Sequence, residues 1–98
     1  MAQIPKNLQG ILWSASINKL DLDKHKSYII HQVLMYGDFS HIQWLFDTYS
    51  KKQIQKVFLE KPQKIYTKPA INYISKYILG LKNTPPFDKY VSTIYKSS

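Results

Sequence analysis

The sequence contains no cysteine and no arginine. The absence of cysteine excludes disulfide bonds, thiolate zinc sites and a cysteine nucleophile, and it favours a reducing, cytoplasmic location. All 14 basic side chains are lysines, so the bidentate guanidinium fork that reads guanine edges is missing. A lysine still attracts phosphate as a point charge, so the sequence disfavours sharp reading of G·C-rich DNA without disfavouring phosphate binding.

Long hydrophobic runs are also absent. No stretch approaches the roughly 20 apolar residues that a membrane helix needs, and the N-terminus lacks a basic region followed by an apolar one. We therefore expect no membrane segment and no secretory signal. The 98 residues, 44% of them hydrophobic and 20% charged, are typical of one globular domain and too few for a large enzyme.

The charge is positive and unevenly distributed. The net charge is +8, and residues 1–50 hold four lysines and four aspartates, whereas residues 51–98 hold ten lysines against Glu60 and Asp88. Such asymmetry indicates an anionic partner: nucleic acid, an acidic protein face or a membrane surface. The alternative is a surface that only keeps the chain in solution.

Apolar residues recur at helical spacing, and capping residues separate the segments. The first helix is predicted over residues 23–36, with Asp21 and Asp23 as candidate N-caps and Gly37 as its terminator. Before it, an extended arm or short turn is expected to pack Trp13 onto the body.

Asp38 or Ser40 is predicted to cap a second helix that ends near Tyr49. A capping box at Ser50 then predicts a third helix over residues 51–61. Because the join between the two is tight, they are also compatible with a helix-turn-helix.

Thr67 is predicted to cap a fourth helix that ends at Gly80. Its apolar face is expected to consist of Ala70, Ile71, Ile74, Tyr77, Ile78 and Leu81. With no convincing strand anywhere, we expect an all-α fold: a small bundle of four helices with a short fifth helix at the C-terminus.

The pattern breaks at Pro85 and Pro86, which predicts a helical domain with an N-terminal arm over residues 1–82 and a linker with an amphipathic segment over residues 83–98. This last segment either docks on the body as a fifth helix or waits for a partner. Its candidate partner-binding residues are Phe87, Tyr90, Val91, Ile94 and Tyr95. Tyr66 and Tyr73 are further aromatic residues without an obvious place in the predicted core.

An enzyme is not expected, because the chemistry that catalysis needs is missing. Most of the six acidic residues have structural places at helix starts or among lysines, and no metalloprotease, P-loop or serine-hydrolase motif is present. The three histidines, His25, His31 and His41, lack the spacing that places two metal ligands on one helix face. We predict no catalytic residues, no cofactor and no metal, and interpret His25 and His31 as ordinary helix-face residues.

The third helix is the candidate nucleic-acid-binding element. On a helical wheel, lysines and a glutamine lie opposite its apolar stripe, and further lysines follow in the next loop. The candidate residues are Lys51, Lys52, Gln55, Lys56, Lys61, Lys64 and Lys68, with Gln55 suited to contact adenine. A solvated lysine face explains the same residues, and the turn lacks the glycine that is common in helix-turn-helix motifs.

The order of several residues resembles a known family. The marks are Leu12-Trp13, Leu20-Asp21, Tyr28-Ile29-Ile30, Val33-Leu34, Gly37, Trp44-Leu45, Tyr49, Ile54 and Val57, within residues 11–80. They resemble a family of small uncharacterised bacterial helical domains that are often encoded beside nucleotidyltransferase toxins of the abortive-infection type. The sequence departs from that pattern at Ser14, where many members have an acid, and at Ser50, where glycine is common. The resemblance implies an accessory or antitoxin-like role, with no catalytic residues to transfer.

Three functions follow as hypotheses. The first is a non-enzymatic antitoxin-like protein that binds and restrains a partner protein, for which a nucleotidyltransferase-type toxin is the first candidate. The second is a helix-turn-helix regulator that binds DNA, and both activities can coexist in one chain. The third, a phage-borne inhibitor of a host defence protein, is not separated from the first by the sequence, and whether the chain forms homo-oligomers also stays open.

Overall fold

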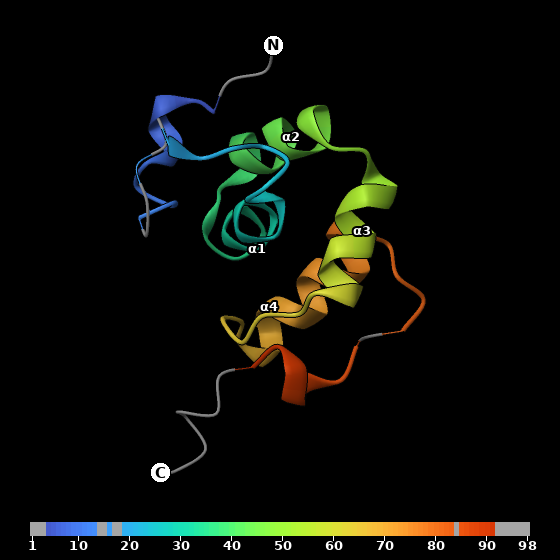
Figure 1. The fold of residues 1–98 in the computed structure, drawn as a ribbon. Coiled ribbons are helices and arrows are strands. Elements are labelled where there is room, and N and C mark those ends of the chain that lie inside the picture. The colour runs from blue at the N-terminus through green and yellow to red at the C-terminus, as the bar shows by residue number, and fades with distance from the viewer. Residues whose placement is uncertain (1–3, 14–15, 17–18, 84, 92–98) are drawn as a thin grey trace, which may run out of the picture.

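The computed structural model describes residues 4–13, 16, 19–83 and 85–91 of the chain. Its four α-helices are α1 (Lys26–Tyr36), α2 (Phe39–Thr48), α3 (Lys51–Glu60) and α4 (Lys68–Tyr73). Figure 1 shows α1 end-on near the centre, with α2 above it, α3 to its right and α4 below. In the described residues β pairing is confined to one isolated bridge, so the predicted all-α class with four helices is confirmed.

The start of α1 differs from the prediction. Asp21 accepts backbone N–H groups from Asp23 at 2.8 Å and from Lys24 at 3.0 Å, and these bonds hold the chain in a turn before the helix. The His25 N–H also donates to the Asp21 carbonyl at 2.9 Å, so Asp21 caps a single turn, and α1 begins after that turn at Lys26 instead of residue 23. His25 occupies the N-cap position without a capping side-chain bond.

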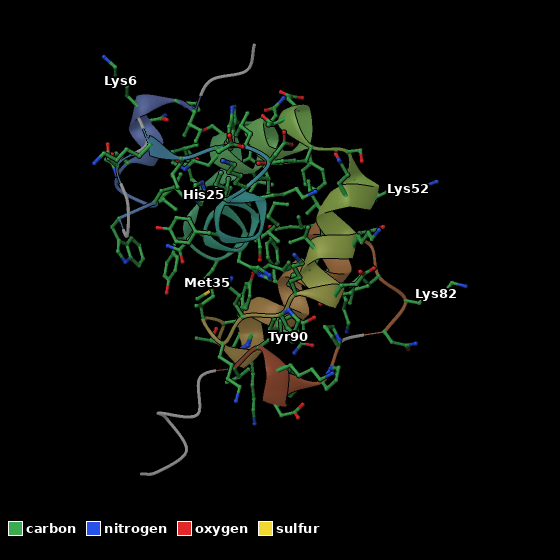
Figure 2. All side chains as sticks on the ribbon, viewed as in Figure 1. Lys6, His25, Met35, Lys52, Lys82 and Tyr90 are labelled. Carbon is green, nitrogen blue, oxygen red and sulfur yellow. The ribbon has the colours of Figure 1, made fainter. Side chains whose placement is uncertain are left out.

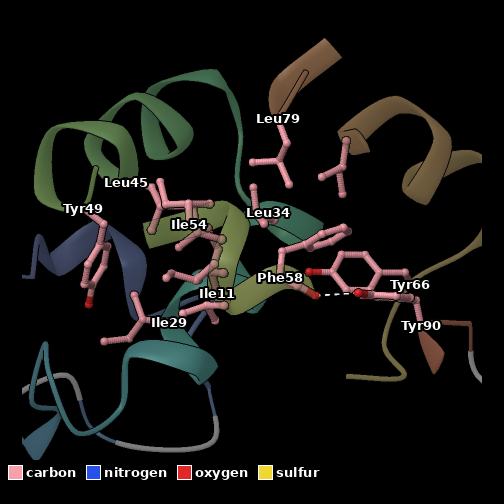
Figure 3. Close-up of a cluster of buried hydrophobic side chains, with 14 of the residues drawn as sticks. Ile11, Ile29, Leu34, Leu45, Tyr49, Ile54, Phe58, Tyr66, Leu79 and Tyr90 are labelled. Carbon is pink, nitrogen blue, oxygen red and sulfur yellow. Dashed lines mark hydrogen bonds between the residues drawn. The ribbon is translucent and has the colours of Figure 1, made fainter. Parts of the chain in front are cut away.

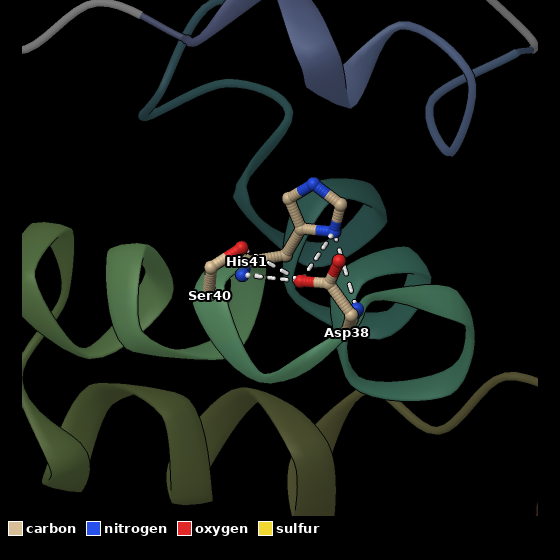
Figure 4. Close-up of polar contacts among 3 residues, drawn as sticks. All are labelled: Asp38, Ser40 and His41. Carbon is tan, nitrogen blue, oxygen red and sulfur yellow. Dashed lines mark hydrogen bonds and ion pairs between the residues drawn. The ribbon is translucent and has the colours of Figure 1, made fainter.

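The starts of α2 and α3 follow the predicted capping chemistry. Asp38 caps α2, and its carboxylate accepts the His41 N–H at 3.1 Å and the Ser40 hydroxyl at 2.7 Å (Figure 4). Ser50 caps α3, and its hydroxyl oxygen accepts the Gln53 N–H at 3.2 Å. In each box the third helical side chain bonds back to the N-cap N–H, so two otherwise unpaired donors are satisfied at each helix start.

After α4 the chain continues as a π-helix over Ile74–Ile78. The Leu79 N–H donates to the Ile74 carbonyl at 2.8 Å, five residues back, which is the bond of a π-helical turn. The Leu79 side chain is fully buried. The wider turn rotates Tyr77 out of the apolar stripe in which the sequence predicted it, and its side chain is 77% exposed. The expected core position of Tyr77 is therefore wrong, and Leu79 occupies it.

Two glycines are required by the backbone. Gly80 ends the helical segment with φ of +63°, in the left-handed region that favours glycine, as the C-terminal signal predicted. Gly37 ends α1 in extended conformation, and a Cβ there would lie 2.6 Å from the Val33 carbonyl oxygen and 2.9 Å from the His41 Cβ. Only glycine allows α1 and the start of α2 to approach so closely.

The N-terminal arm is attached to the core by aliphatic side chains. A short 3-10 helix, Lys6–Leu8, precedes a turn in which Leu8 and Leu12 are fully buried. Gln32 of α1 donates its amide to the Ile11 carbonyl at 2.8 Å and secures the turn. Trp13, which the sequence predicted to anchor the arm, is 58% exposed and only packs edge-on against Tyr36, with ring centroids 4.9 Å apart.

The C-terminal segment enters the core without forming a fifth α-helix in its described part. Phe87–Lys89 is a single 3-10 turn, and Tyr90 behind it is 1% exposed. Figure 3 shows Tyr90 packed with Phe58 and Tyr66. The Tyr66 N–H donates to the Tyr90 carbonyl at 2.9 Å, and Tyr66 bridges Val91 in parallel. The described part of the segment is therefore a single 3-10 turn followed by an isolated bridge, where an amphipathic helix was predicted.

No helix in the described part of the chain combines the length and the apolar character that crossing a membrane requires.

Candidate functional site

A groove lies between α2 and the segment formed by α4 and the π-helix. The groove has a volume of about 460 Å³. It is lined by residues of the α1–α2 turn, of α2 and of the stretch 73–78. Its lining consists of Gly37, Asp38, Phe39, Ile42, Gln43, Phe46, Asp47, Tyr73, Tyr77 and Ile78. Six of these ten residues are apolar or aromatic, and none is a lysine, although the chain contains 14.

The walls of this groove are aromatic side chains that the core leaves uncovered. Phe39 is 84% exposed, Tyr77 is 77% exposed and Tyr73 is 58% exposed. Tyr73 and Tyr77 lie one turn apart with ring centroids separated by 5.6 Å, so they form one surface. Single exposed aromatics are common, but here several surround one groove and together form a larger exposed apolar patch.

The acidic character of the groove comes from α2. Asp38 stands at its N-cap and Asp47 near its C-terminal end, about 13 Å apart at the rise of an α-helix. The bond from the Ser40 hydroxyl, with the His41 N–H, lowers the pKa of Asp38 below its ordinary value, so this carboxylate is ionised at neutral pH. His41 Nδ1 accepts the Asp38 backbone N–H at 3.1 Å, which closes the capping box, and the same nitrogen lies 3.3 Å from the Asp38 carboxylate (Figure 4).

The sequence did not identify this groove as a site. Tyr73 was recognised as lacking a core position, but Phe39 has the helical spacing of the apolar stripe of α2 and Tyr77 that of α4. The only available signal was the charge pattern, because Asp38 and Asp47 belong to the lysine-free stretch 27–50. The π-helix that turns Tyr77 outward leaves no recognisable mark in the sequence.

The predicted partner-binding residues of the tail lie in different environments. Tyr90 is a core residue, stacked on Phe58 at 4.8 Å, so its side chain is not accessible to a partner. Phe87 is half-buried beneath the Lys68 ammonium, which lies 5.6 Å from its ring centroid, and Val91 is half-buried at the bridge to Tyr66. Ile94 and Tyr95 lie outside the described residues. The tail, as far as it is described, completes the core.

The predicted lysines are on the surface. Those of α3 and of the loop after it, together with Lys68 at the start of α4, are all exposed: Lys51, Lys52, Lys56, Lys61, Lys64 and Lys68. Figure 2 shows the Lys52 side chain pointing away from the body. Across the described residues, no lysine nitrogen lies within 4.0 Å of a carboxylate oxygen.

Gln55 has an internal role that the helical wheel did not reveal. Its amide Nε2 donates to the Leu79 carbonyl at 2.6 Å, across to the end of the π-helix. The carbonyls in the last turn of a helix lack partners within the helix, and Gln55 satisfies one of them. The amide nitrogen of Gln55 is therefore engaged within the protein, and its contact with adenine stays a prediction.

His31 lies on α1, on the face that is fully buried. Nε2 lies 2.7 Å from the Lys61 carbonyl oxygen, to which it donates, and Nδ1 accepts from the Tyr66 hydroxyl at 2.7 Å. Burial lowers the pKa of His31 and raises that of Tyr66, so both are neutral. The pair joins α1 to the loop after α3 and has no access to a ligand.

A second hollow, of about 190 Å³, lies between the start of α1 and the C-terminal half of α3. Lysines from both elements surround it, with two acidic residues among them: Asp23, Lys24, Lys26, Ser27, Lys56, Val57, Glu60 and Lys61. Among the described residues, no group of three or more histidine, aspartate or glutamate side chains is placed to hold a metal ion.

The Family of unknown function (DUF6922) matches residues 8–58. The match runs from the buried Leu8 of the arm to Phe58, the last core residue of α3, and leaves α4 and the tail outside. The family description names no activity and no partner, so the association with a nucleotidyltransferase toxin stays a prediction. No curated protein and no solved structure matches the chain.

Proposed function

The chain belongs to the Family of unknown function (DUF6922), and from that premise we propose that it is a non-enzymatic protein that binds and restrains a partner protein at the groove between α2 and α4. The observation that carries the proposal is the uncovered aromatic wall of Phe39, Tyr73 and Tyr77. Aromatic side chains that cluster in a groove are the typical anchors of protein interfaces.

A protein partner suits this groove better than a small molecule. The groove volume of about 460 Å³ is within the range of ligand pockets, but such pockets bury most of the ligand. Here the walls themselves are mostly in water, since Phe39 and Tyr77 are more than three-quarters exposed. A broad partner surface would cover both rings, whereas a small ligand would leave them solvated.

The charges of the groove specify the partner further. Asp38 and Asp47 carry negative charge at the two ends of α2, and no lysine lies between them in the lining. An amphipathic helix that places its apolar face against Phe39 and Tyr77 and carries lysine or arginine at its ends complements this pattern. A second copy of this chain, with its net charge of +8, is disfavoured by long-range repulsion.

The role that fits such a protein is antitoxin-like, in a cytoplasmic setting that the absence of cysteine favours. A nucleotidyltransferase-type toxin is the first partner to test, because the family resemblance implies it. A phage-borne inhibitor of a host defence protein would use the same groove in the same way. The tail is not the primary contact in this proposal, since Tyr90 is needed in the core.

The test places a photoreactive phenylalanine analogue at position 39 or, as a matched control, at Leu59, which is 47% exposed on α3 outside the groove. Irradiation in cells of the source organism should give one crosslinked protein from position 39 and not from position 59. The crosslinked protein is identified by mass spectrometry, purified and titrated with the wild-type chain and with F39A, Y77A and L59A.

We expect F39A and Y77A each to weaken the purified complex at least tenfold, in line with the truncation of an interface anchor, while L59A changes affinity less than twofold. If the partner is an enzyme, its activity should fall to a plateau at the equivalence point. Equal affinities for all four chains, or crosslinking that is the same from both positions, would refute the groove as the binding site.

A further inference from the structure

Folding brings together lysines that are far apart in the sequence. Lys24 lies in the turn before α1 and Lys26 is the first residue of α1, whereas Lys56 lies in the second half of α3 and Lys61 just after it. All four line the hollow of about 190 Å³ between the two helices, because α3 packs against α1. We call this surface, defined by the four lysines, the basic hollow.

The charge of the basic hollow is not neutralised from within. Asp23 and Glu60 also line it, which leaves four positive charges against two negative ones. No ammonium nitrogen of the hollow lies within 4.0 Å of either carboxylate in the described structure. Lys52, one turn before Lys56 on the exposed side of α3, extends the positive surface toward the helix start (Figure 2).

The chemistry of this surface is unlike that of a protein interface. Its one apolar lining residue, Val57, is almost completely buried, so the hollow offers a partner no exposed apolar side chain beyond the stems of its charged residues. Protein interfaces have an apolar centre, whereas contacts to nucleic-acid phosphates are made by lysine, by hydroxyls such as that of Ser27 and by other polar groups.

The hollow also lacks the features that single strands and sequence reading require. Single-strand binding uses aromatic platforms, and no aromatic residue lines the hollow. Base reading from α3 would have used Gln55, which is bonded to the Leu79 carbonyl instead. What remains is a set of point charges suited to the backbone of a duplex.

We propose that the basic hollow binds the phosphate backbone of a nucleic-acid duplex without reading its base sequence. The contacts come from the start of α1 as well as from α3, so this is not the helix-turn-helix readout that the sequence suggested. None of the four lysines lines the groove between α2 and α4, so the two binding surfaces are independent. One chain can therefore hold a partner protein and a duplex.

The test measures fluorescence anisotropy of a labelled 20-base-pair duplex DNA of arbitrary sequence, with the full chain, between 50 and 200 mM salt. With about four phosphates neutralised, affinity should fall on the order of 100-fold over this range. The variant K24Q/K26Q/K56Q/K61Q should lose at least tenfold in affinity at 50 mM salt and show a markedly shallower salt dependence. Duplexes of different base composition should bind alike.

The matched control is K6Q/K76Q/K82Q/K89Q, which removes the same charge from exposed lysines outside the hollow. It should retain affinity within about threefold and keep the wild-type slope. Unchanged thermal midpoints show that both variants fold, and F39A, the groove variant, should bind the duplex normally.

The proposal is overturned by an absence of binding at 50 mM salt or by equal losses in the two quadruple variants. It is also overturned if phosphatidylserine vesicles or polyglutamate compete better than unlabelled duplex, because either result assigns the hollow to another class of anion. Failure here leaves the groove proposal standing, since the crosslinking test involves neither these lysines nor nucleic acid.

Discussion

Tyr90 stacks on the ring of Phe58, with centroids 4.8 Å apart, and donates its hydroxyl to the Phe58 backbone carbonyl at 2.6 Å (Figure 3). The carbonyl belongs to the last turn of α3, where no intrahelical partner is available. A residue 32 positions along the chain thus completes the helix end. Burial raises the pKa of Tyr90, so the hydroxyl stays a donor at any ordinary pH.

We predict that Y90F lowers the free energy of unfolding by about 1–3 kcal/mol, because the ring still stacks but the buried Phe58 carbonyl loses its donor. The measurement is urea unfolding followed by circular dichroism. Y36F is the control: Tyr36 is 44% exposed, and its hydroxyl makes no hydrogen bond in the described part of the chain. A Y90F chain as stable as Y36F would show that the bond contributes nothing.

Bonds from a side chain to a distant helix-end carbonyl also occur between other elements. They separate the features that could be predicted from the sequence from those that could not. Local rules located the helices: the capping boxes at Asp38 and Ser50 and the left-handed Gly80 are where the patterns predicted them. These features depend on residues within four positions of one another. A single sequence displays such short-range chemistry directly.

Long-range bonds were not predictable in this way. Gln55 and His31 each satisfy a helix-end carbonyl, at Leu79 and Lys61, and which polar side chain reaches which carbonyl depends on packing. Gln55 was assigned to the surface and His31 only to a helix face, because only helical spacing was available. Burial was misassigned for the same reason at Tyr77, where the π-helix shifts the periodicity by one residue.

In the candidate sites, too, local features could be predicted from the sequence, whereas features that depend on packing could not. Exposure of the lysines on α3 followed from their position opposite the apolar stripe. Their meeting with Lys24 and Lys26 required the packing of α3 against α1, and the groove required the placement of α4 beside α2. Each site is shared between two elements, and sequence order does not say which elements meet.

Gly37 provides a prediction about the join between α1 and α2. In G37A the new methyl group would stand 2.6 Å from the Val33 carbonyl oxygen, which is backbone and cannot move without disturbing α1. We expect a loss of about 1–3 kcal/mol in the free energy of unfolding, as for other overpacked sites. Chemical denaturation of the purified variant gives the value.

Gly10 is the matched control, because a Cβ there would meet nothing within 4 Å and its φ is not positive. G10A should be neutral or slightly stabilising, through the reduced entropy of the unfolded chain. If G37A proved as stable as G10A, the close approach of the two helices at Gly37 would not restrict the fold.

His31 makes stability depend on pH. Buried between the Tyr66 hydroxyl and the Lys61 carbonyl, beside the Phe58 ring, it is held neutral, and burial lowers its pKa below the ordinary value of 6.5. Between the folded and unfolded pKa values of His31, only the unfolded chain binds the proton. The contribution of neutral His31 to the free energy of unfolding is therefore fully present above about pH 6.5 and is lost as the pH falls below that value. Asp21 and Asp38 also have lowered pKa values, but they change the stability only below the ordinary carboxyl pKa of 3.8, which is a separate pH range.

We therefore predict that the free energy of unfolding decreases between pH 7 and pH 5, with a contribution from His31 of at most about 1.4 kcal/mol per pH unit. Urea unfolding at several pH values measures the slope, and H31Q is the comparison. H31Q should be less stable at pH 7, because the hydrogen bonds to Tyr66 and Lys61 are altered, but its slope should be shallower. Since His25 and His41 are present in both chains, the difference in slope belongs to His31, and identical slopes would mean that protonation of His31 does not oppose folding.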